Sequence, residues 1–301
     1  MTTLALNNFN HMGMERKLIR KYTTVGQPGF LGRGHIAHPV ILGNYSDSDP
    51  FILLMDDRLD KKDEEPVGGP HPHAGFETVT LMLEGELGVG SHKMKAGDLQ
   101  IMTAGSGVIH TETIDKKTQM RLLQLWLILP QKDRWTKPRV QDLPLEHVPE
   151  MTENGVHIKL YSGSLSGLKS PIQNYTAFIL ADIQIEPYVT TTFQIPADYN
   201  TFLYVLNGSL KLGHDQETLE QDQVGWLDLY ADQVPSDLKI TAGIQGVRFV
   251  LYSGKPQGDP IVSHGPFIGD NTEDIRRLYQ EYRQDKMQDI SSISKAQQIA
   301  L

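Results

Sequence analysis

The 301-residue chain contains no cysteine. Disulfide bonds, thiolate nucleophiles, iron–sulfur clusters and cysteine-type zinc sites are therefore excluded. A metal ion bound by this chain must be held by nitrogen and oxygen donors, which points to histidine and carboxylate side chains.

An excess of positive charge is also missing. The chain has 28 Lys and Arg residues against 37 Asp and Glu residues, and its formal net charge is -9. Nucleic acids and anionic membranes are bound through clustered cations, so this balance argues against either of them as a partner.

Long hydrophobic runs are missing as well. The longest strongly apolar stretch, residues 122–129, includes Gln124. It is far shorter than the ~20 residues that a membrane-spanning helix needs. The N-terminal segment lacks the basic and apolar regions of a secretion signal. These absences predict a cytoplasmic enzyme or binding protein.

What the chain does contain is a series of short segments rich in Val, Ile, Thr and aromatic residues, separated by glycine and proline. This pattern is typical of an all-β sandwich or barrel, and it lacks the long alternating helices of a doubly wound α/β fold. The predicted strands lie at residues 51–55, 77–83, 99–103, 108–114, 122–129, 159–161, 176–183, 190–195, 201–206, 224–229 and 248–252.

One helix is predicted near the C-terminus, at residues 272–287. Its apolar residues recur at helical spacing and form one stripe, made of Ile275, Leu278, Tyr279 and Tyr282. Asn271 or Thr272 can cap its first turn. We expect this helix to pack over a β-domain, and a partner-binding helix is the alternative.

A faint internal repeat indicates two copies of one β-fold. Glu84-Gly85 and Asn207-Gly208 each follow a predicted strand, and a turn and a further strand follow each of them. The chain length also suits two domains. Residues 130–144 contain three prolines and six charged residues and have the composition of a connector. We therefore divide the chain into domains at residues 1–135 and 136–301.

Four residues are the best candidates for chemistry. His71 and His73 are two positions apart, and so are His110 and Glu112. Side chains at i and i+2 of a strand point to the same face. If the two segments face each other inside a barrel, three imidazoles and one carboxylate converge and suit a divalent first-row metal with open positions. Surface or core histidines are the alternative interpretation.

The other candidate ligands receive weaker interpretations. Glu77 shares strand parity with His73 and is expected to point inward. It could be a fifth ligand, a group that orients a histidine, or a buried carboxylate bonded to a neighbour. We favour the role of orienting a histidine. The acidic run at residues 56–65 is interpreted as a solvated loop. The remaining histidines are interpreted as non-ligands: His11, His35, His38, His92, His147, His157, His214 and His264.

Longer motifs around these residues resemble those of the pirin family, a branch of the cupin superfamily. The first-half motifs are His71-Pro72-His73-Ala74-Gly75-Phe76-Glu77-Thr78-Val79, Glu84-Gly85, Gly97-Asp98-Leu99-Gln100, Met102-Thr103-Ala104-Gly105-Ser106-Gly107-Val108-Ile109-His110-Thr111-Glu112 and Leu123-Gln124-Leu125-Trp126. The C-terminal motifs are Gly265-Pro266-Phe267-Ile268 and Asn271-Thr272-Glu273-Asp274-Ile275.

The resemblance implies an all-β bicupin, with two jelly-roll β-barrel domains and a C-terminal α-helix. It places an iron ion in the first domain, held by three histidines and one glutamate that match His71, His73, His110 and Glu112. It leaves the second domain without metal. Fe(II) is the expected ion, although the same ligands would also accept Mn, Ni, Cu or Zn.

The resemblance also implies function. Pirins include enzymes that oxidise flavonols such as quercetin with O2, and nuclear proteins that act as transcription cofactors. We expect a quercetin 2,3-dioxygenase-type enzyme in which Glu112 takes the hydroxyl proton of a small aromatic or enol substrate. The alternatives are a metal- or redox-dependent binding protein that modulates a transcription factor or metabolic enzyme, and a metal-stabilised bicupin with another substrate.

The chain departs from the usual pirin pattern outside the four predicted ligands. Ala74 stands where the family usually has arginine, Ile101 stands where it has tryptophan, and Thr113-Ile114 replaces Met-Pro. The hairpin between Gly85 and Gly97 is also shorter than usual. These changes affect the rim of the expected site, and the identity of the substrate is therefore left open.

Overall fold

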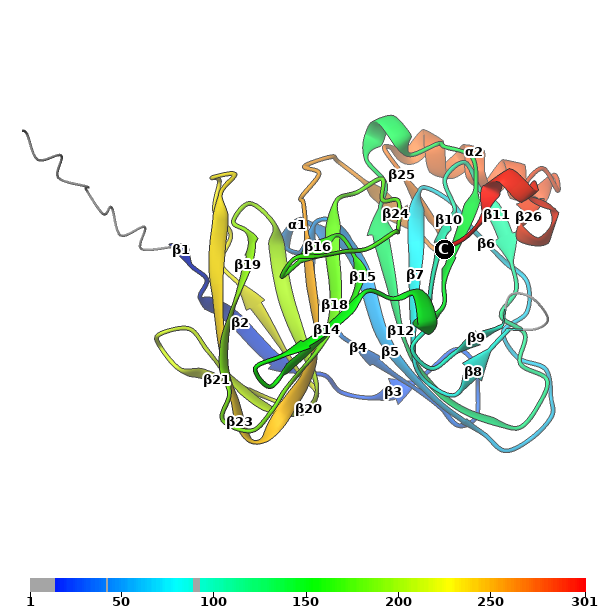
Figure 1. Ribbon diagram of the computed structural model, residues 1–301. Coiled ribbons are helices and arrows are strands. Elements are labelled where there is room, and N and C mark those ends of the chain that lie inside the picture. Colours follow the sequence, from blue (N-terminus) through cyan, green and yellow to red (C-terminus); the bar gives the residue numbers. More distant parts are fainter. Residues whose placement is uncertain (1–13, 42, 89–92) are drawn as a thin grey trace, which may run out of the picture.

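The computed structural model describes residues 14–41, 43–88 and 93–301. Two large curved sheets lie side by side, and a helix and the C-terminal segment cover one end of the first (Figure 1). The first sheet has the strand order β27 (Gln298–Ala300), β13 (Arg139–Leu143), β10 (Leu99–Thr103), β7 (Phe76–Glu84), β12 (Thr118–Ile128), β5 (Phe51–Lys61), β4 (His35–Pro39), β3 (Gln27–Pro28).

The second sheet has the strand order β14 (Glu150–Glu153), β15 (Val156–Ser162), β18 (Phe178–Ile185), β23 (Pro235–Gly254), β20 (Asn200–Leu212), β22 (Gln223–Leu227), β2 (Leu18–Thr23). β1 (Met14–Glu15) and β19 (Thr190–Pro196) also pair with β23, and β21 (Glu217–Glu220) pairs with β20.

Smaller ladders complete the two barrels. They are β6 (His71–His73) with β11 (Val108–His110) and β26 (Gln288–Asp289), β8 (Glu86–Leu87) with β9 (Met94–Lys95), β16 (Ser164–Leu165) with β17 (Leu168–Lys169), and β24 (Val262–His264) with β25 (Phe267–Gly269). The helices are α1 (Tyr45–Ser48) and α2 (Thr272–Arg283), with short 3-10 helices at Gln131–Asp133, Leu145–His147, Ile290–Ser292 and Lys295–Gln297.

The predicted all-β class is confirmed, and every predicted strand overlaps an observed one. The strands that the prediction missed include β1 to β4 near the N-terminal end, β13 and β14 in the middle of the chain, and β24 to β27 near its C-terminal end. The predicted strand at residues 108–114 ends early, because β11 stops at His110. Glu112 therefore lies beyond the end of this strand.

One apolar cluster joins the two barrels. On β20, Phe202 and Tyr204 belong to this inter-barrel cluster, whereas Leu203 and Val205 point into the second barrel. The ring of Phe51 on β5 meets the ring of Phe202 edge to face, with centroids 5.3 Å apart. Since strand side chains alternate between faces, one strand supplies both the interface and the barrel interior.

Apolar side chains, most of them aliphatic, fill the interior of the second barrel. They include Ile158, Ile183, Leu203, Leu238 and Phe249, all almost completely buried. The absence of metal from this domain stays a prediction.

Strands cross the predicted domain boundary in both directions. β1 and β2 pair with β23 and β22 of the second sheet, whereas β13 and β27 extend the first. The predicted connector at residues 130–144 therefore contains a strand. Each large sheet thus contains strands from both sides of residue 135. The division of the chain at this residue stays a prediction.

The internal repeat has a structural counterpart at Gly85 and Gly208. Both glycines have positive φ, 75° and 74°. A Cβ atom at Gly85 would lie 2.3 Å from the carbonyl oxygen of Gln119, and one at Gly208 would lie 2.2 Å from that of Gly246. Each barrel thus uses glycine where the backbones of adjacent strands approach closely.

Helix α2 lies where the sequence predicts it, with the expected cap. The Asn271 side chain accepts a hydrogen bond from the backbone N–H of Asp274, at 3.0 Å. The helix ends at Arg283 instead of residue 287, and Asp285 beyond it takes a left-handed φ of 52°. Ile275 and Leu278 are buried against the first barrel. No helix in the described ranges is long and apolar enough to span a bilayer.

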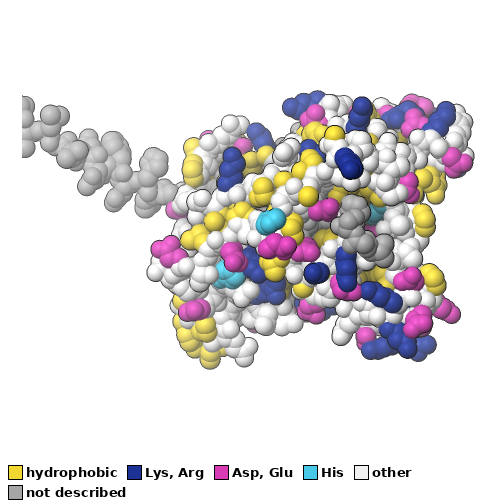
Figure 2. Space-filling view, turned by 45° about the vertical axis from the view of Figure 1, so that its right-hand side comes forward, with side chains coloured by type: hydrophobic (Ala, Val, Ile, Leu, Met, Phe, Trp, Pro, Cys, Tyr) yellow, Lys and Arg dark blue, Asp and Glu magenta, His cyan; other side chains and the backbone are white. Residues whose placement is uncertain are grey.

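The acidic run at residues 56–65 was expected to be a solvated loop, and this prediction is wrong for its first half. Residues 56–61 belong to β5, and the side chains of Asp56, Asp57 and Lys61 are buried. Asp56 is neutralised by Arg58 and Arg121 at the inter-barrel contact. Elsewhere, acidic and basic side chains are interspersed over the face seen in Figure 2.

Candidate metal centre

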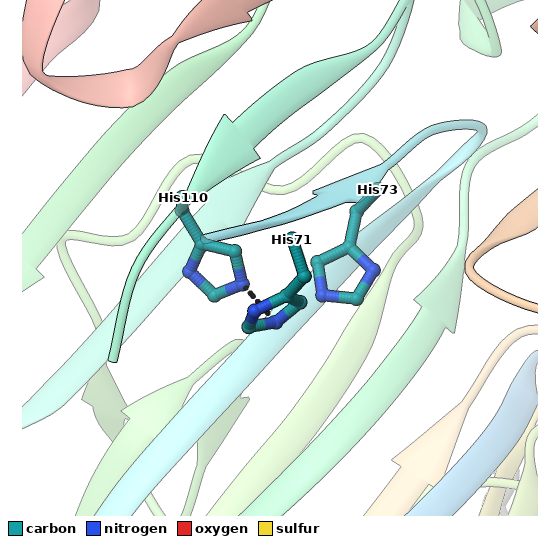
Figure 3. Close-up of side chains that lie close together, drawn as sticks. All are labelled: His71, His73 and His110. Carbon is teal, nitrogen blue, oxygen red and sulfur yellow. Dashed lines mark hydrogen bonds between the residues drawn. The ribbon is translucent and has the colours of Figure 1, made fainter. Parts of the chain in front are cut away.

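Three histidine side chains meet between β6 and β11 (Figure 3). The two strands pair antiparallel, so that His71 lies opposite His110 and His73 lies opposite Val108. One ring nitrogen from each histidine lies within 4.8 Å of the other two. The structure therefore brings together the three predicted histidines.

The spacing of these nitrogens suits a shared metal ion. Nε2 of His71 and Nε2 of His110 are 2.8 Å apart. Two imidazole nitrogens that bind one metal at right angles, each at about 2.1 Å, would be about 3.0 Å apart. The pair is thus arranged almost as adjacent ligands of one ion would be.

Backbone groups orient the rings. Nδ1–H of His71 donates a hydrogen bond to the carbonyl of Gly69, at 2.9 Å, which leaves Nε2 as the nitrogen that faces the cluster. Metal-binding histidines commonly have such a partner on the second nitrogen. Nδ1 of His73 is buried without a well-formed hydrogen bond from the described residues, although the Pro266 carbonyl lies close enough to influence the ring.

Of the three clustered histidines, His73 and His110 are the most buried, and their surroundings favour the neutral ring. Burial, together with the neighbouring imidazoles of His110 and His71, lowers the pKa of His73 to about 2. Burial also lowers the pKa of His110 to about 4, against the opposing effect of Glu112. A neutral ring keeps the lone pair that a metal needs, so the environment prepares these side chains as ligands.

Glu112 lies outside the cluster of ring nitrogens. Because β11 ends at His110, strand alternation no longer fixes the direction of the Glu112 side chain. Its backbone N–H donates to the carbonyl of Gly68, at 3.0 Å. Its carboxylate Oε1 accepts a hydrogen bond from Nε2 of Gln124, at 3.2 Å. Its role as a fourth ligand stays a prediction.

Glu77 does not orient a histidine. A turn at Gly75, with φ of 88°, separates β6 from β7 and breaks the parity between His73 and Glu77. Glu77 lies opposite Thr103, whose hydroxyl donates to its Oε1. Its other oxygen is buried without a hydrogen bond from the described residues. The inward position expected from the sequence is therefore wrong, and the alternative of a buried carboxylate is correct.

An aromatic wall lies beside the histidines. The rings of Phe76 and Trp126 stack with centroids 4.3 Å apart, and Trp126 lies 5.2 Å from the ring of His73. Partly buried Tyr45 and Ile52 pack against the apolar cluster that contains Phe76. A flat apolar surface next to polar donors is typical of a site for an aromatic ligand.

The C-terminal segment forms another wall. Ala74, where the family usually has arginine, is fully buried and forms a β-bridge with Phe267. β26 pairs with β11, which places Asp289 beside Ile109. A segment distant in the sequence thus covers the strands that carry the histidines.

Sequence reasoning missed the polar residues around Glu112. Gln124 and Thr80 lie on the interior face of the first sheet and are hydrogen-bonded to each other. The available signal was a single polar residue, Gln124, in an otherwise apolar run two positions before Trp126. A polar side chain at an interior strand position calls for a hydrogen-bonding partner.

Two of the histidines interpreted as non-ligands lie beside a carboxylate instead of beside other histidines. His35 is paired with Asp57, at 2.8 Å, and His157 with Glu150, at 3.2 Å. His11 and His92 lie outside the described residues. Within the described part of the chain, His71, His73 and His110 are the one group of three candidate ligands that lie this close together.

Comparison with known proteins identifies relatives over most of the chain. The family model "Pirin" matches residues 25–127, and the model "Pirin C-terminal cupin domain" matches residues 180–288. Human pirin is 33% identical over 249 residues, which cover 79% of this chain and 82% of human pirin.

Solved structures of similar fold also match most of the chain. The structure of GK1651 from Geobacillus kaustophilus is 32% identical with a TM-score of 0.74, and the match covers 83% of this chain and 100% of that one. A quercetin 2,3-dioxygenase from Acinetobacter baumannii is 25% identical with a TM-score of 0.78, covering 90% and 98%. The predicted resemblance is confirmed, and this chain belongs to the pirin family and has a bicupin fold.

Proposed function

We propose that this protein is a metal-dependent dioxygenase of the quercetin 2,3-dioxygenase type, which cleaves a flavonol or similar enol with O2 and uses iron as its metal. The observation that carries the proposal is the histidine cluster beside an aromatic wall. The structural likeness to a quercetin 2,3-dioxygenase supports it. A cytoplasmic location and a small aromatic or enol substrate complete the proposal.

The residues present fit such a metal. His71, His73 and His110 would hold it through neutral imidazole nitrogens, and Glu112 would add one carboxylate oxygen. When bound, a divalent iron ion supplies Lewis-acid stabilisation of the substrate oxyanion and the redox capacity that reaction with O2 requires.

The side chains around the cluster have separate roles in this mechanism. Trp126, which is partly exposed and is backed by the fully buried ring of Phe76, offers a flat surface on which an aromatic substrate stacks. Glu112 accepts the substrate hydroxyl proton at Oε2, since Oε1 already accepts a hydrogen bond from Gln124.

An oxidation assay tests the proposal. Protein loaded with Fe(II) is incubated aerobically with quercetin, and loss of the flavonol absorption band and of dissolved O2 is followed. We expect Glu112→Ala to reduce turnover by about 100-fold or more, because positioned general bases contribute about 100- to 10,000-fold. Glu153→Ala, which changes an exposed carboxylate on β14, should leave turnover unchanged.

Turnover by the wild-type protein that is no faster than that of the Glu112→Ala variant would contradict the proposal. Iron content is measured in each sample, so that a loss of turnover in the variant is separated from a loss of metal.

A further inference from the structure

Gln124 is placed to control the carboxylate of Glu112. Its side chain projects from β12 into the first barrel, on the same strand face as Trp126. Nε2 lies 3.2 Å from Oε1 of Glu112 and 3.3 Å from Oγ1 of Thr80. Gln124 thus reaches a carboxylate that lies beyond the end of β11, while Thr80 on the neighbouring strand β7 contacts the same amide nitrogen.

The contacts fix the orientation of the Gln124 amide. An amide nitrogen carries two protons, and here one points to a carboxylate oxygen and the other to a hydroxyl oxygen. The reversed amide would place its carbonyl oxygen against the carboxylate of Glu112, where two acceptors repel each other. The amide group therefore acts as a donor toward Glu112.

We propose that Gln124 is the positioning residue of Glu112. By occupying Oε1, it holds the carboxylate in one orientation and leaves Oε2 as the oxygen available to a metal ion or to a substrate proton. Thr80 supports this arrangement by holding the second amide proton. The inference rests on the proposed function, because it takes Glu112 as metal ligand and proton acceptor.

The arrangement has a measurable consequence for metal binding. A hydrogen-bond partner behind a ligating side chain pre-orients the ligand, and its loss typically weakens metal binding about 10- to 100-fold. Leucine at position 124 keeps a side chain of similar length but removes the donor. Its effect should therefore pass through Glu112 and vanish when the Glu112 carboxylate is itself removed.

The test is a Co(II) titration of the full-length protein, followed by visible absorption, which reports both affinity and coordination geometry. Gln124→Leu should bind Co(II) about 10- to 100-fold more weakly than wild type, with a changed spectrum. Thr80→Val should weaken binding less, in the same direction. Gln194→Leu is the matched control, since Gln194 is exposed on β19 of the second sheet and donates to Asp237 there, and it should match wild type.

A double-mutant cycle completes the design. In a Glu112→Ala background, which lacks the acceptor oxygen, adding Gln124→Leu should change the Co(II) affinity no further. The inference would be overturned if Gln124→Leu bound Co(II) as tightly as wild type. It would also be overturned if Gln124→Leu lost the same Co(II) affinity with and without the Glu112 carboxylate. Absence of Co(II) binding by the wild-type protein would overturn both proposals. Absence of quercetin turnover with the coupling intact would overturn the dioxygenase proposal alone.

Discussion

Replacing Asp56 with asparagine is expected to lower the free energy of unfolding by about 3 kcal/mol, because it removes the fully buried anion that partly buried Arg58 and Arg121 share. Asp56 has no exposed surface. Its oxygens accept hydrogen bonds from Arg58 at 2.6 Å, from Arg121 at 2.8 Å and from the Tyr204 hydroxyl at 2.8 Å. Arg58 keeps a second partner in Asp222, whereas Arg121 forms its ion pair with Asp56 among the residues that the structure describes.

Urea unfolding at neutral pH measures this loss. Asp182→Asn is the matched control, because Asp182 pairs with one arginine, Arg248, whose side chain is 38% exposed. The control should lose clearly less stability. A loss for Asp56→Asn no larger than that of the control would show that the cluster between the barrels contributes little.

The acid response of Asp56 follows from the same contacts. Burial alone would raise its pKa, but the hydrogen bonds from Arg121 and Arg58 outweigh burial and hold the pKa below its usual value of 3.8. The folded state therefore gains stability from this group above the unfolded pKa and loses it as the pH falls through the lower, folded pKa.

Replacing Glu77 with glutamine is expected to stabilise the protein at pH 8 by up to about 3 kcal/mol and to have little effect at pH 5. Burial raises the pKa of Glu77 from 4.5 to about 7, although Thr103 and Arg139 act in the opposite direction. Between pH 4.5 and about pH 7 the folded chain keeps a proton that the unfolded chain has lost. The free energy of unfolding of the wild type therefore falls as the pH rises through this range. Glutamine removes this dependence while keeping the size of the side chain.

Urea unfolding of both proteins at pH 5 and pH 8 is the measurement. Glu84→Gln, at the exposed end of the same strand, is the control and should show no difference that depends on pH. Equal effects of Glu77→Gln at both pH values would contradict the expected titration of a buried carboxylic acid.

The sequence predicts those features that depend on local alternation. The i, i+2 spacing of His71 and His73 suffices to place them on one face of β6, because strand geometry enforces it. The cap at Asn271 and the apolar stripe of α2 are equally local. The repeated glycines at positions 85 and 208 follow from close backbone approach, which favours glycine whichever barrel contains it.

The features that the sequence does not predict depend on distant partners. Asp56 resembles a solvated residue until Arg121 and Tyr204, far along the chain, are brought to it. The pairing of β2 with β22 and of β13 with β27 joins segments far apart in the sequence. The parity of Glu77 fails because a turn at Gly75 resets the alternation, and strand alternation does not fix the direction of Glu112 because β11 has already ended at His110.

The central claim is that His71, His73 and His110 bind one metal ion in the first barrel. The most direct test is elemental analysis of protein loaded with Fe(II) without oxygen and then desalted, for wild type, for each single alanine variant of the three histidines, and for His157→Ala in the second barrel. The account predicts stoichiometric iron in the wild type and in His157→Ala, and its loss from the other three variants. Iron retained by those three, or absent from the wild type, would contradict it.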